Sequence, residues 1–325
     1  MARVTFMAAL CMALGATQGA PALAQNYPVK PVKILSVFPT GLTPDIYLRL
    51  VADKLSRQWN QPVIVEPRPG GNGFVGIGAL KNAPADGHEL LLVGNNNLTL
   101  NPLLLKSPPH DVEKDLLPIT TLAYAPFFLY VAGNSPYKNV KDLVAAARQS
   151  PDKVSYSTNY VGSPPHMGGA MLAQMTGTQM LAIHFKDGAQ LYSSIVSGDI
   201  TFTVTTSGAA EPLLKAGRLR TLASASAKRN PDAPDVPTVD ESLGLTGYEV
   251  DAWVCLTALR GTPMEIANKI SADVTRVMAE PEVKERYKAL GVQAASTTPQ
   301  ELAARIKTTL AKNADLIQKI GLKPE

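Results

Sequence analysis

The sequence predicts an α/β protein of two lobes with a cleft between them. Short strand-like runs alternate with helical patterns from Val32 onward, which is typical of a parallel sheet covered by helices. A stretch rich in Asn and Pro at residues 95–118 interrupts the alternation, which then restarts as a second α/β unit. About 300 residues remain once a leader is removed, and chains of that size tend to divide into two lobes.

The first residues have the features of a cleavable signal peptide. Arg3 supplies a positive charge, residues 6–16 form an apolar run, and Ala22-Leu23-Ala24 places small residues where signal peptidase reads them. The apolar run is shorter than the ~20 residues that a membrane-spanning helix needs. We therefore predict a signal peptide at residues 1–24, cleavage after Ala24 and export to the periplasm. The alternative is an apolar N-terminus on a cytosolic protein.

Charge and cysteine content argue against several classes of protein. Removing residues 1–24 takes away Arg3 and no acid, so the net charge of +4 falls to +3. With 18% charged residues and no basic cluster, we expect no nucleic-acid partner. Cys255 is the one cysteine after cleavage, so no intramolecular disulfide is possible and a buried thiol is expected. We expect a monomer.

The first α/β unit is predicted from three apolar runs and one amphipathic segment. Strands are expected at residues 32–38, 62–66 and 88–93. Residues 44–60 form a helix whose apolar side chains share one face, and Asp45 lies near its positive end. A glycine-rich turn and a short helix follow the second strand.

The second unit repeats the pattern, and a final strand returns the chain to the first lobe. The expected elements are apolar runs at 119–124 and 127–132, a helix at 140–149, a strand at 153–157, a helix at 165–175, a strand at 179–185, a helix at 189–196, a strand at 200–205, a helix at 209–216, a strand at 219–224, a strand at 248–259 and helices at 263–279, 282–290 and 299–320. The first lobe is thus predicted to hold residues 25–124 and 248–325, and the second lobe residues 125–247, with two crossings between them.

Motifs for catalysis, metals and cofactors are missing. The four histidines have no partners at metal-ligand spacing, and neither a nucleophile elbow nor a Walker A loop occurs. Residues 71–76 match G-x-G-x-x-G after a strand, but the next strand ends in Gly94-Asn95-Asn96-Asn97, without the acid that would hold a ribose. These glycines are expected to form a tight turn and let the helix approach the sheet. We predict no cofactor, no metal and no catalytic residue.

Several loops are suited to holding an anion. Residues 39–45, Asn95 to Asn97 and Ser157 to Ser163 all follow the carboxyl ends of strands, where open α/β sheets bind ligands. Free backbone N–H groups and hydroxyls at helix starts would point at such a ligand. Each loop taken alone could equally be a turn or a helix cap.

Seven segments together resemble a known family. They read YPVKPV (27–32), FPTGLTPD (38–45), QPVIVEPRPGG (61–71), ADGH (85–88), SPPH (163–166), KAGRLR (215–220) and PDVPTV (234–239). This chain resembles, from Tyr27 onward, the substrate-binding component of tripartite tricarboxylate transporters, often called the Bug receptors. The resemblance implies a type II periplasmic-binding-protein fold with two hinge crossovers, closure around a carboxylate ligand and delivery to integral membrane transporter subunits.

The resemblance also implies which residues contact the ligand. The loop matching 38–45 would hold one carboxylate group with its backbone amides and ordered water, and the loops matching 157–163 and 185–188 would close over the ligand from the other lobe. The predicted ligand-binding residues are Phe38, Thr40, Gly41, Leu42, Asp45, Asn95, Asn96, Ser157, Asn159, Tyr160, Gly162, Ser163, His184, Phe185 and Thr205. Family ligands include di- and tricarboxylates, acidic amino acids, nicotinate and aromatic acids.

The chain departs from the family pattern inside this site. Leu42 and Tyr160 stand where the family usually has glycine, and His184 stands where it often has proline. Thr205 replaces a frequent acid, which removes a partner for an ammonium group and argues against an amino-acid ligand. With Phe185, Leu42 and Tyr160 could accommodate a ring, and His184 could pair with a second carboxylate.

The sequence therefore predicts a receptor that binds a di- or tricarboxylate or an aromatic acid without transforming it. One alternative is a receptor that signals to a membrane sensor. The other is a periplasmic hydrolase or isomerase of an organic acid, for which Asp45 and His184 are the candidate acid–base groups.

Overall fold

The computed structural model describes residues 26–151, 153–158, 163–185 and 188–319. The predicted signal peptide and its cleavage site lie outside these residues. Within the described ranges, no helix is both long and apolar enough to cross a membrane.

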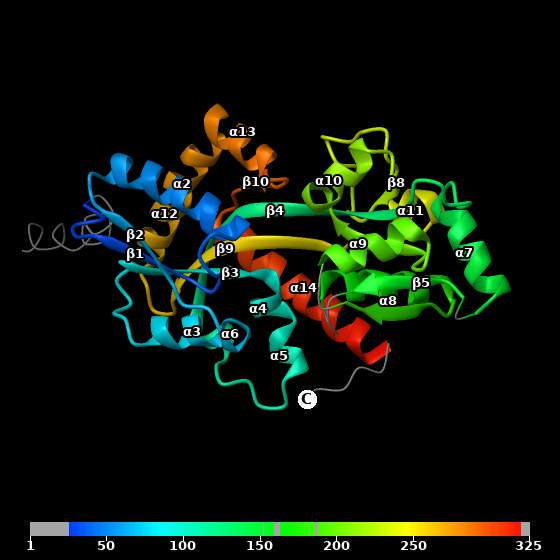
Figure 1. The fold of residues 1–325 in the computed structure, drawn as a ribbon. Coiled ribbons are helices and arrows are strands. Elements are labelled where there is room, and N and C mark those ends of the chain that lie inside the picture. Colours follow the sequence, from blue (N-terminus) through cyan, green and yellow to red (C-terminus); the bar gives the residue numbers. More distant parts are fainter. Residues whose placement is uncertain (1–25, 152, 159–162, 186–187, 320–325) are drawn as a thin grey trace, which may run out of the picture.

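The described strands form one sheet that runs through two lobes (Figure 1). The strands are β1 (Val32–Ser36), β2 (Val63–Pro67), β3 (Glu89–Gly94), β4 (Leu116–Ala132), β5 (Ser155–Thr158), β6 (Leu181–His184), β7 (Phe202–Thr206), β8 (Leu219–Ser224), β9 (Asp251–Leu259) and β10 (Gln293–Ala294). Their order is β2-β1-β3-β9-β4-β7-β5-β6, and β8 and β10 also pair with β4. We call the half that contains β1 to β3 the first lobe, and the half that contains β5 to β8 the second lobe.

Parallel pairing dominates inside each lobe, as the βα alternation predicts. The strand β1 pairs in parallel with β2 and β3, and β5 pairs in parallel with β6 and β7. Parallel strands need crossover connections, and the helices between these strands supply them. The carboxyl ends of β1 and β3 therefore lie at one edge of the first lobe.

Two antiparallel strands connect the lobes. The strand β4 pairs with β9 from Leu116 to Pro126 and then with β7 and β8 as far as Ala132. We expected two separate runs here, but they form one strand. Pro126 has no N–H to donate to a neighbouring strand. It is tolerated because it lies where β4 stops pairing with β9 and begins to pair with β7. The two-lobed fold with two crossovers is confirmed.

The lobe boundaries stay a prediction. The predicted change after residue 124 falls within β4, and the change before residue 248 falls just ahead of β9.

The helices cover the sheet, and those that the sequence predicts lie close to their expected positions. They are α2 (Thr43–Trp59), η1 (Gly71–Gly73), α3 (Phe74–Lys81), α4 (Asn95–Thr99), α5 (Asn101–Leu104), α6 (Val112–Asp115), α7 (Val140–Gln149), α8 (Pro164–Thr176), α9 (Gly188–Ser197), α10 (Ser207–Lys215), α11 (Val239–Leu243), α12 (Met264–Ala279), α13 (Pro281–Ala289) and α14 (Pro299–Lys319). The short helices α4, α5 and α6 occupy the stretch rich in Asn and Pro that interrupts the predicted alternation, and α11 follows β8; these four helices were not predicted.

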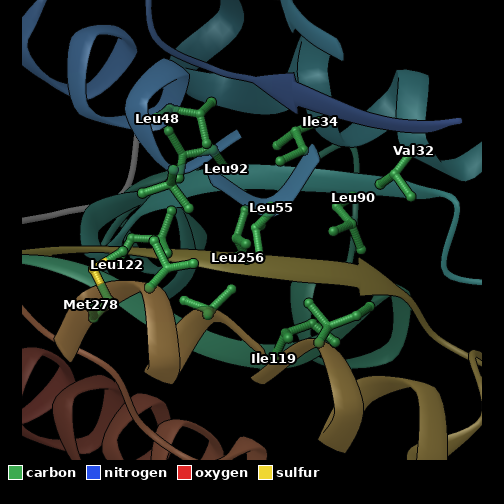
Figure 2. Close-up of a cluster of buried hydrophobic side chains, with 14 of the residues drawn as sticks. Val32, Ile34, Leu48, Leu55, Leu90, Leu92, Ile119, Leu122, Leu256 and Met278 are labelled. Carbon is green, nitrogen blue, oxygen red and sulfur yellow. The ribbon is translucent and has the colours of Figure 1, made fainter. Parts of the chain in front are cut away.

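The core of the first lobe lies between α2, the sheet and α12 (Figure 2). Leu48 and Leu55 of α2 are fully buried in the same cluster as Leu92 of β3 and Leu256 of β9. Burying one such side chain contributes roughly 1.5–3 kcal/mol. The amphipathic face of α2 therefore fixes the start of this helix, and with it the loop that follows β1.

The last helix differs from the prediction because it contacts both lobes. We expected the terminal helices to pack on the first lobe. Leu316 and Ile317 of α14 lie in one buried cluster with Leu100 of the first lobe and Met167 of the second. The C-terminal part of α14 therefore joins the lobes in addition to β4 and β9.

Candidate functional site

A cavity of about 550 Å³ lies between the two lobes. Its walls come from the loop after β1, the glycine-rich turn after β2, the helices α4 and α5, the strand β9 and the first residue of α8. The lining residues are Val37, Phe38, Pro39, Pro69, Gly70, Asn72, Gly73, Gly94, Asn95, Asn96, Asn97, Leu100, Asn101, Leu104, Leu105, Pro164, Ala252, Trp253 and Val254. The volume is within the ~300–1,000 Å³ that small-molecule pockets occupy.

The loop between β1 and α2 is held by Asp45. The backbone N–H of Gly41, whose φ is +82°, donates to Asp45 Oδ2 at 2.9 Å. Arg49 donates to both carboxylate oxygens, at 3.0 and 2.9 Å. Burial raises the pKa of Asp45, but the Arg49 guanidinium and the Gly41 N–H outweigh it and hold this pKa below its usual value. The Asp45 carboxylate thus holds the loop in place through these hydrogen bonds. Thr40 and Leu42 of the same loop are exposed.

Hydrogen bonds of asparagine side chains hold the part of the cavity wall that α4, α5 and the glycine-rich turn form. Asn97 Oδ1 accepts the N–H of Gly94 at 2.9 Å, which caps α4. The Nδ2 groups of Asn97 and Asn101 both donate to the carbonyl of Asn72, at 2.7 and 2.8 Å. Asn95 is buried and Asn96 half-buried at the start of α4. These contacts tie the glycine-rich turn to α4.

The glycines of this turn have the structural role that we predicted. The φ of Gly73 is +92°, and a Cβ on Gly73 would lie 2.4 Å from Asn97 Nδ2. A Cβ on Gly76 would lie 3.0 Å from Val37 Cγ1, so this glycine lets α3 approach the sheet. The prediction of a tight turn with close helix packing is confirmed. We missed Asn72 and Asn101 as wall residues; the position of Asn72 in a turn after a strand was the signal.

The second-lobe loop after β5 is partly described. Ser163 is 2% exposed, and its Oγ lies 2.8 Å from Thr158 Oγ1 and accepts the N–H of His166 at 3.4 Å, which caps α8. Ser157 is fully buried, and its Oγ has no hydrogen-bond partner among the described residues. The predicted ligand residues Asn159, Tyr160 and Gly162 lie outside the described residues.

Three further predicted residues lie at the ends of β6 and β7. His184 is exposed and stacks on His166, with 5.9 Å between the ring centroids. Phe185 is 9% exposed and packs in the hydrophobic cluster of Phe128 and its neighbours. The Oγ1 of Thr205 lies 3.1 Å from the hydroxyl of Tyr192.

The cavity brings together part of the predicted set. Among the predicted residues that the structure describes, Phe38, Asn95 and Asn96 line it. The described residues that do not line it are Thr40, Gly41, Leu42, Asp45, Ser157, Ser163, His184, Phe185 and Thr205. Their contact with a ligand stays a prediction.

The cavity is lined by uncharged groups. The described side chains around the cavity are amides or apolar groups, and none of them is charged. Amide N–H groups can donate to a carboxylate, and the apolar groups can cover a hydrocarbon body. No cluster of His, Cys, Asp and Glu suited to a metal ion occurs within the described part of the chain.

Comparison with known proteins gives a consistent result. Residues 47–322 match the family described as tripartite tricarboxylate transporter family receptor. A UPF0065 protein of Bordetella bronchiseptica is 31% identical over 324 residues, which cover 100% of this chain and 95% of that protein.

Two solved structures resemble this fold closely. R. palustris Rpa4515 with adipate is 28% identical, with a TM-score of 0.75, and the match covers 92% of this chain and 100% of that one. The periplasmic binding protein BugD is 27% identical, with a TM-score of 0.70, and the match again covers 92% and 100%.

Proposed function

The chain belongs to the receptor family of tripartite tricarboxylate transporters, and we propose that it is a periplasmic receptor that binds a small carboxylate between its lobes and delivers it to membrane transporter subunits. The observation that carries the proposal is the cavity that Phe38, Asn95 and Asn96 line from the first lobe and Pro164 from the second. A ligand there would touch both lobes, so binding would favour the closed arrangement. A transporter could then recognise the closed, loaded form.

The lining indicates an acid with a hydrocarbon body. Asn96 and its neighbouring amides could donate to carboxylate oxygens, while Phe38 and Leu104 offer apolar surface. The structurally similar R. palustris protein contains adipate, which is an acid of this kind. No acidic side chain among the described lining residues would hold an ammonium group, which argues against an amino acid. The proposed ligands are therefore dicarboxylates, tricarboxylates and aromatic acids.

A receptor function is better supported than an enzymatic one. Asp45, one of the two candidate acid–base groups, is engaged by Arg49 and Gly41. His184 stacks on another imidazole. We also propose that the chain is exported by its signal peptide, acts as a monomer, and has residues 125–247 as its second lobe.

A thermal-shift screen of the mature protein tests this function. Each acid is paired with its uncharged amide, for example adipate with adipamide and benzoate with benzamide. An acid at ~100 times its dissociation constant should stabilise the protein by ~2.7 kcal/mol, and the matching amide should have little effect. Equal shifts for acid and amide, or a shift with non-acids alone, would contradict the carboxylate proposal. Consumption of the acid during incubation, followed by mass spectrometry, would instead support an enzyme.

A further inference from the structure

A second cavity, of about 420 Å³, lies between α4, α8 and α14. Its lining residues are Asn95, Asn96, Leu100, Pro164, Met167, Met171, Glu249, Val250, Ala304, Arg305, Thr308, Thr309, Lys312 and Asn313. We call it the α14 cavity. Asn95, Asn96, Leu100 and Pro164 also line the interlobe cavity described above. The two cavities therefore share a wall, and this wall contains Asn96, one of the amides proposed to hold a carboxylate.

Asn96 is the asparagine of the shared wall that can turn without cost. It is half-buried, and its side chain makes no hydrogen bond within the described parts of the chain. The amides of Asn97 and Asn101, in contrast, both donate to the carbonyl of Asn72. An amide without such a partner changes its rotamer without breaking a hydrogen bond. A carboxylate held by Asn96 therefore lies at the boundary of the two cavities, and the rest of the ligand can extend into either one.

One face of α14 forms a wall of the α14 cavity. The six α14 residues in the lining recur every three to four positions, which places them on one side of the helix. Asn313 Nδ2 donates to the carbonyl and to the hydroxyl of Thr99, at 3.1 and 3.2 Å. Lys312 Nζ lies 2.9 Å from a carboxylate oxygen of Glu249. These contacts hold α14 against α4 and against the segment before β9, so the cavity does not need a ligand to form.

The lining of the α14 cavity is apolar at depth and polar at its exposed side. Leu100 and Met167 are buried and Met171 is half-buried, and methionine side chains adapt to the shape of an apolar ligand. Thr308 is exposed and Thr309 is half-buried. Neither threonine hydroxyl is among the buried polar atoms, and neither has a hydrogen-bond partner within the described residues. A hydrocarbon chain can therefore lie against the apolar side chains while a polar end group reaches the threonines.

We propose that the α14 cavity extends the ligand site and accommodates the far part of an unbranched dicarboxylate longer than adipate, such as sebacate. The inference rests on the proposed function, because it takes Asn96 as a group that holds the first carboxylate. The chain lies along Met167 and Met171, and the second carboxylate accepts hydrogen bonds from the hydroxyls of Thr308 and Thr309. Water still solvates this carboxylate at the exposed side, which avoids the cost of burying an unpaired charge.

Calorimetric titration of the mature protein with adipate and with sebacate tests this proposal. Each methylene that the cavity buries should raise the affinity up to roughly fourfold, so the wild type should bind sebacate about tenfold or more tightly than adipate. Ala304→Phe places a ring in the α14 cavity and should lower the sebacate affinity about tenfold or more relative to the adipate affinity. Thr309→Val, which removes the hydroxyl, should weaken sebacate binding several-fold.

Ala311→Phe is the matched control, because Ala311 is an exposed alanine of the same helix that lines neither cavity. It should leave the ratio of the sebacate affinity to the adipate affinity at its wild-type value. Ala304 is exposed too, so neither replacement should prevent folding, and thermal melting checks this.

Two results would overturn the extension of the site while leaving a carboxylate receptor intact. One is an equal affinity ratio in wild type and Ala304→Phe, and the other is sebacate binding no tighter than adipate binding in the wild type. If no carboxylate of any kind binds, the proposed function fails together with the extension.

Discussion

The backbones of Gly208 and Gly291 are in contact where the two lobes meet. A Cβ on Gly291 would lie 2.5 Å from Gly208 Cα and 3.0 Å from Gly208 N. Gly208 is in the first turn of α10 in the second lobe, and Gly291 follows α13 in the first lobe with a φ of +71°. A side chain on Gly291 would therefore force the lobes apart at this point.

Gly291→Ala should destabilise the protein strongly. The left-handed conformation costs a residue with a side chain about 1–2 kcal/mol, and overpacking against backbone adds about 1–3 kcal/mol. Urea unfolding should show the combined loss. The control is Gly244→Ala, because Gly244 has a similar φ of +67° but nothing within 4 Å of the position that its Cβ would take. Equal losses in the two variants would contradict a close contact between the lobes.

Asp45→Asn should lower the free energy of unfolding at pH 7 by about 2 kcal/mol, because hydrogen bonds to charged groups contribute about 1.5–3 kcal/mol. The native pKa of Asp45 is lowered, so its stabilisation is complete above the usual Asp pKa of about 4 and is lost as the pH falls through the lower native value. The difference between wild type and variant should therefore shrink in acid.

Asp53→Asn is the matched control for Asp45. Asp53 pairs with Arg57 at the same spacing in α2, but both side chains are exposed. Exposed pairs of this kind contribute about 0.3–0.5 kcal/mol, so unfolding curves should show a small effect at any pH. Similar losses in both variants would mean that the Gly41 loop does not depend on Asp45.

Much of the fold could be predicted because its signals are local. The helix at residues 140–149 and the strand at 219–224 have the predicted bounds, since apolar periodicity marks both. The helices α4 and α5 were missed because asparagine has a low helix propensity, and α6 was missed because a helix of 4 residues shows too little periodicity to detect. Their stability comes from contacts that periodicity does not report, such as the Asn97 cap and the hydrogen bonds of Asp111 to the N–H groups that follow it.

The candidate site was less predictable because residue type does not reveal what a side chain already contacts. The carboxylate of Asp45 is a residue type that binds ligands, yet Arg49 of the same helix already donates hydrogen bonds to both of its oxygens. Phe185 packs in the hydrophobic cluster of Phe128, a contact that residue type does not report, and its contact with a ligand stays a prediction. Asn95 and Asn96 line the interlobe cavity because they follow the carboxyl end of β3, a position that the topology dictates, while their contact with a ligand stays a prediction.

His184→Gln should raise the pKa of His166. Burial lowers the pKa of His166, and the neighbouring His184 lowers it further. Because the unfolded state takes up a proton near its usual pKa of about 6.5, this histidine destabilises the fold as the pH falls below that value. An NMR titration of the imidazole signals measures the pKa directly. His110→Gln should leave the His166 pKa unchanged, and a shift of equal size there would contradict the direct interaction.

Asn96→Asp should weaken carboxylate binding about tenfold or more. Asn96 lines the interlobe cavity, and replacing its amide with an isosteric carboxylate puts a like charge near the ligand. Two such charges ~4 Å apart repel by roughly 1–4 kcal/mol, depending on how much water screens them. Folding stability should change little, because an acid is tolerated at the start of a helix.

Asn134→Asp is the charge-matched control for this last variant. Asn134 is exposed in the turn after β4, and it does not line the interlobe cavity. Calorimetry with the acid that gives the largest thermal shift should therefore find wild-type affinity in Asn134→Asp and reduced affinity in Asn96→Asp. Raising the salt concentration should partly restore binding in Asn96→Asp, because salt screens the added repulsion. Unchanged affinity in Asn96→Asp would place the ligand elsewhere, since a carboxylate in this cavity could not avoid the new charge.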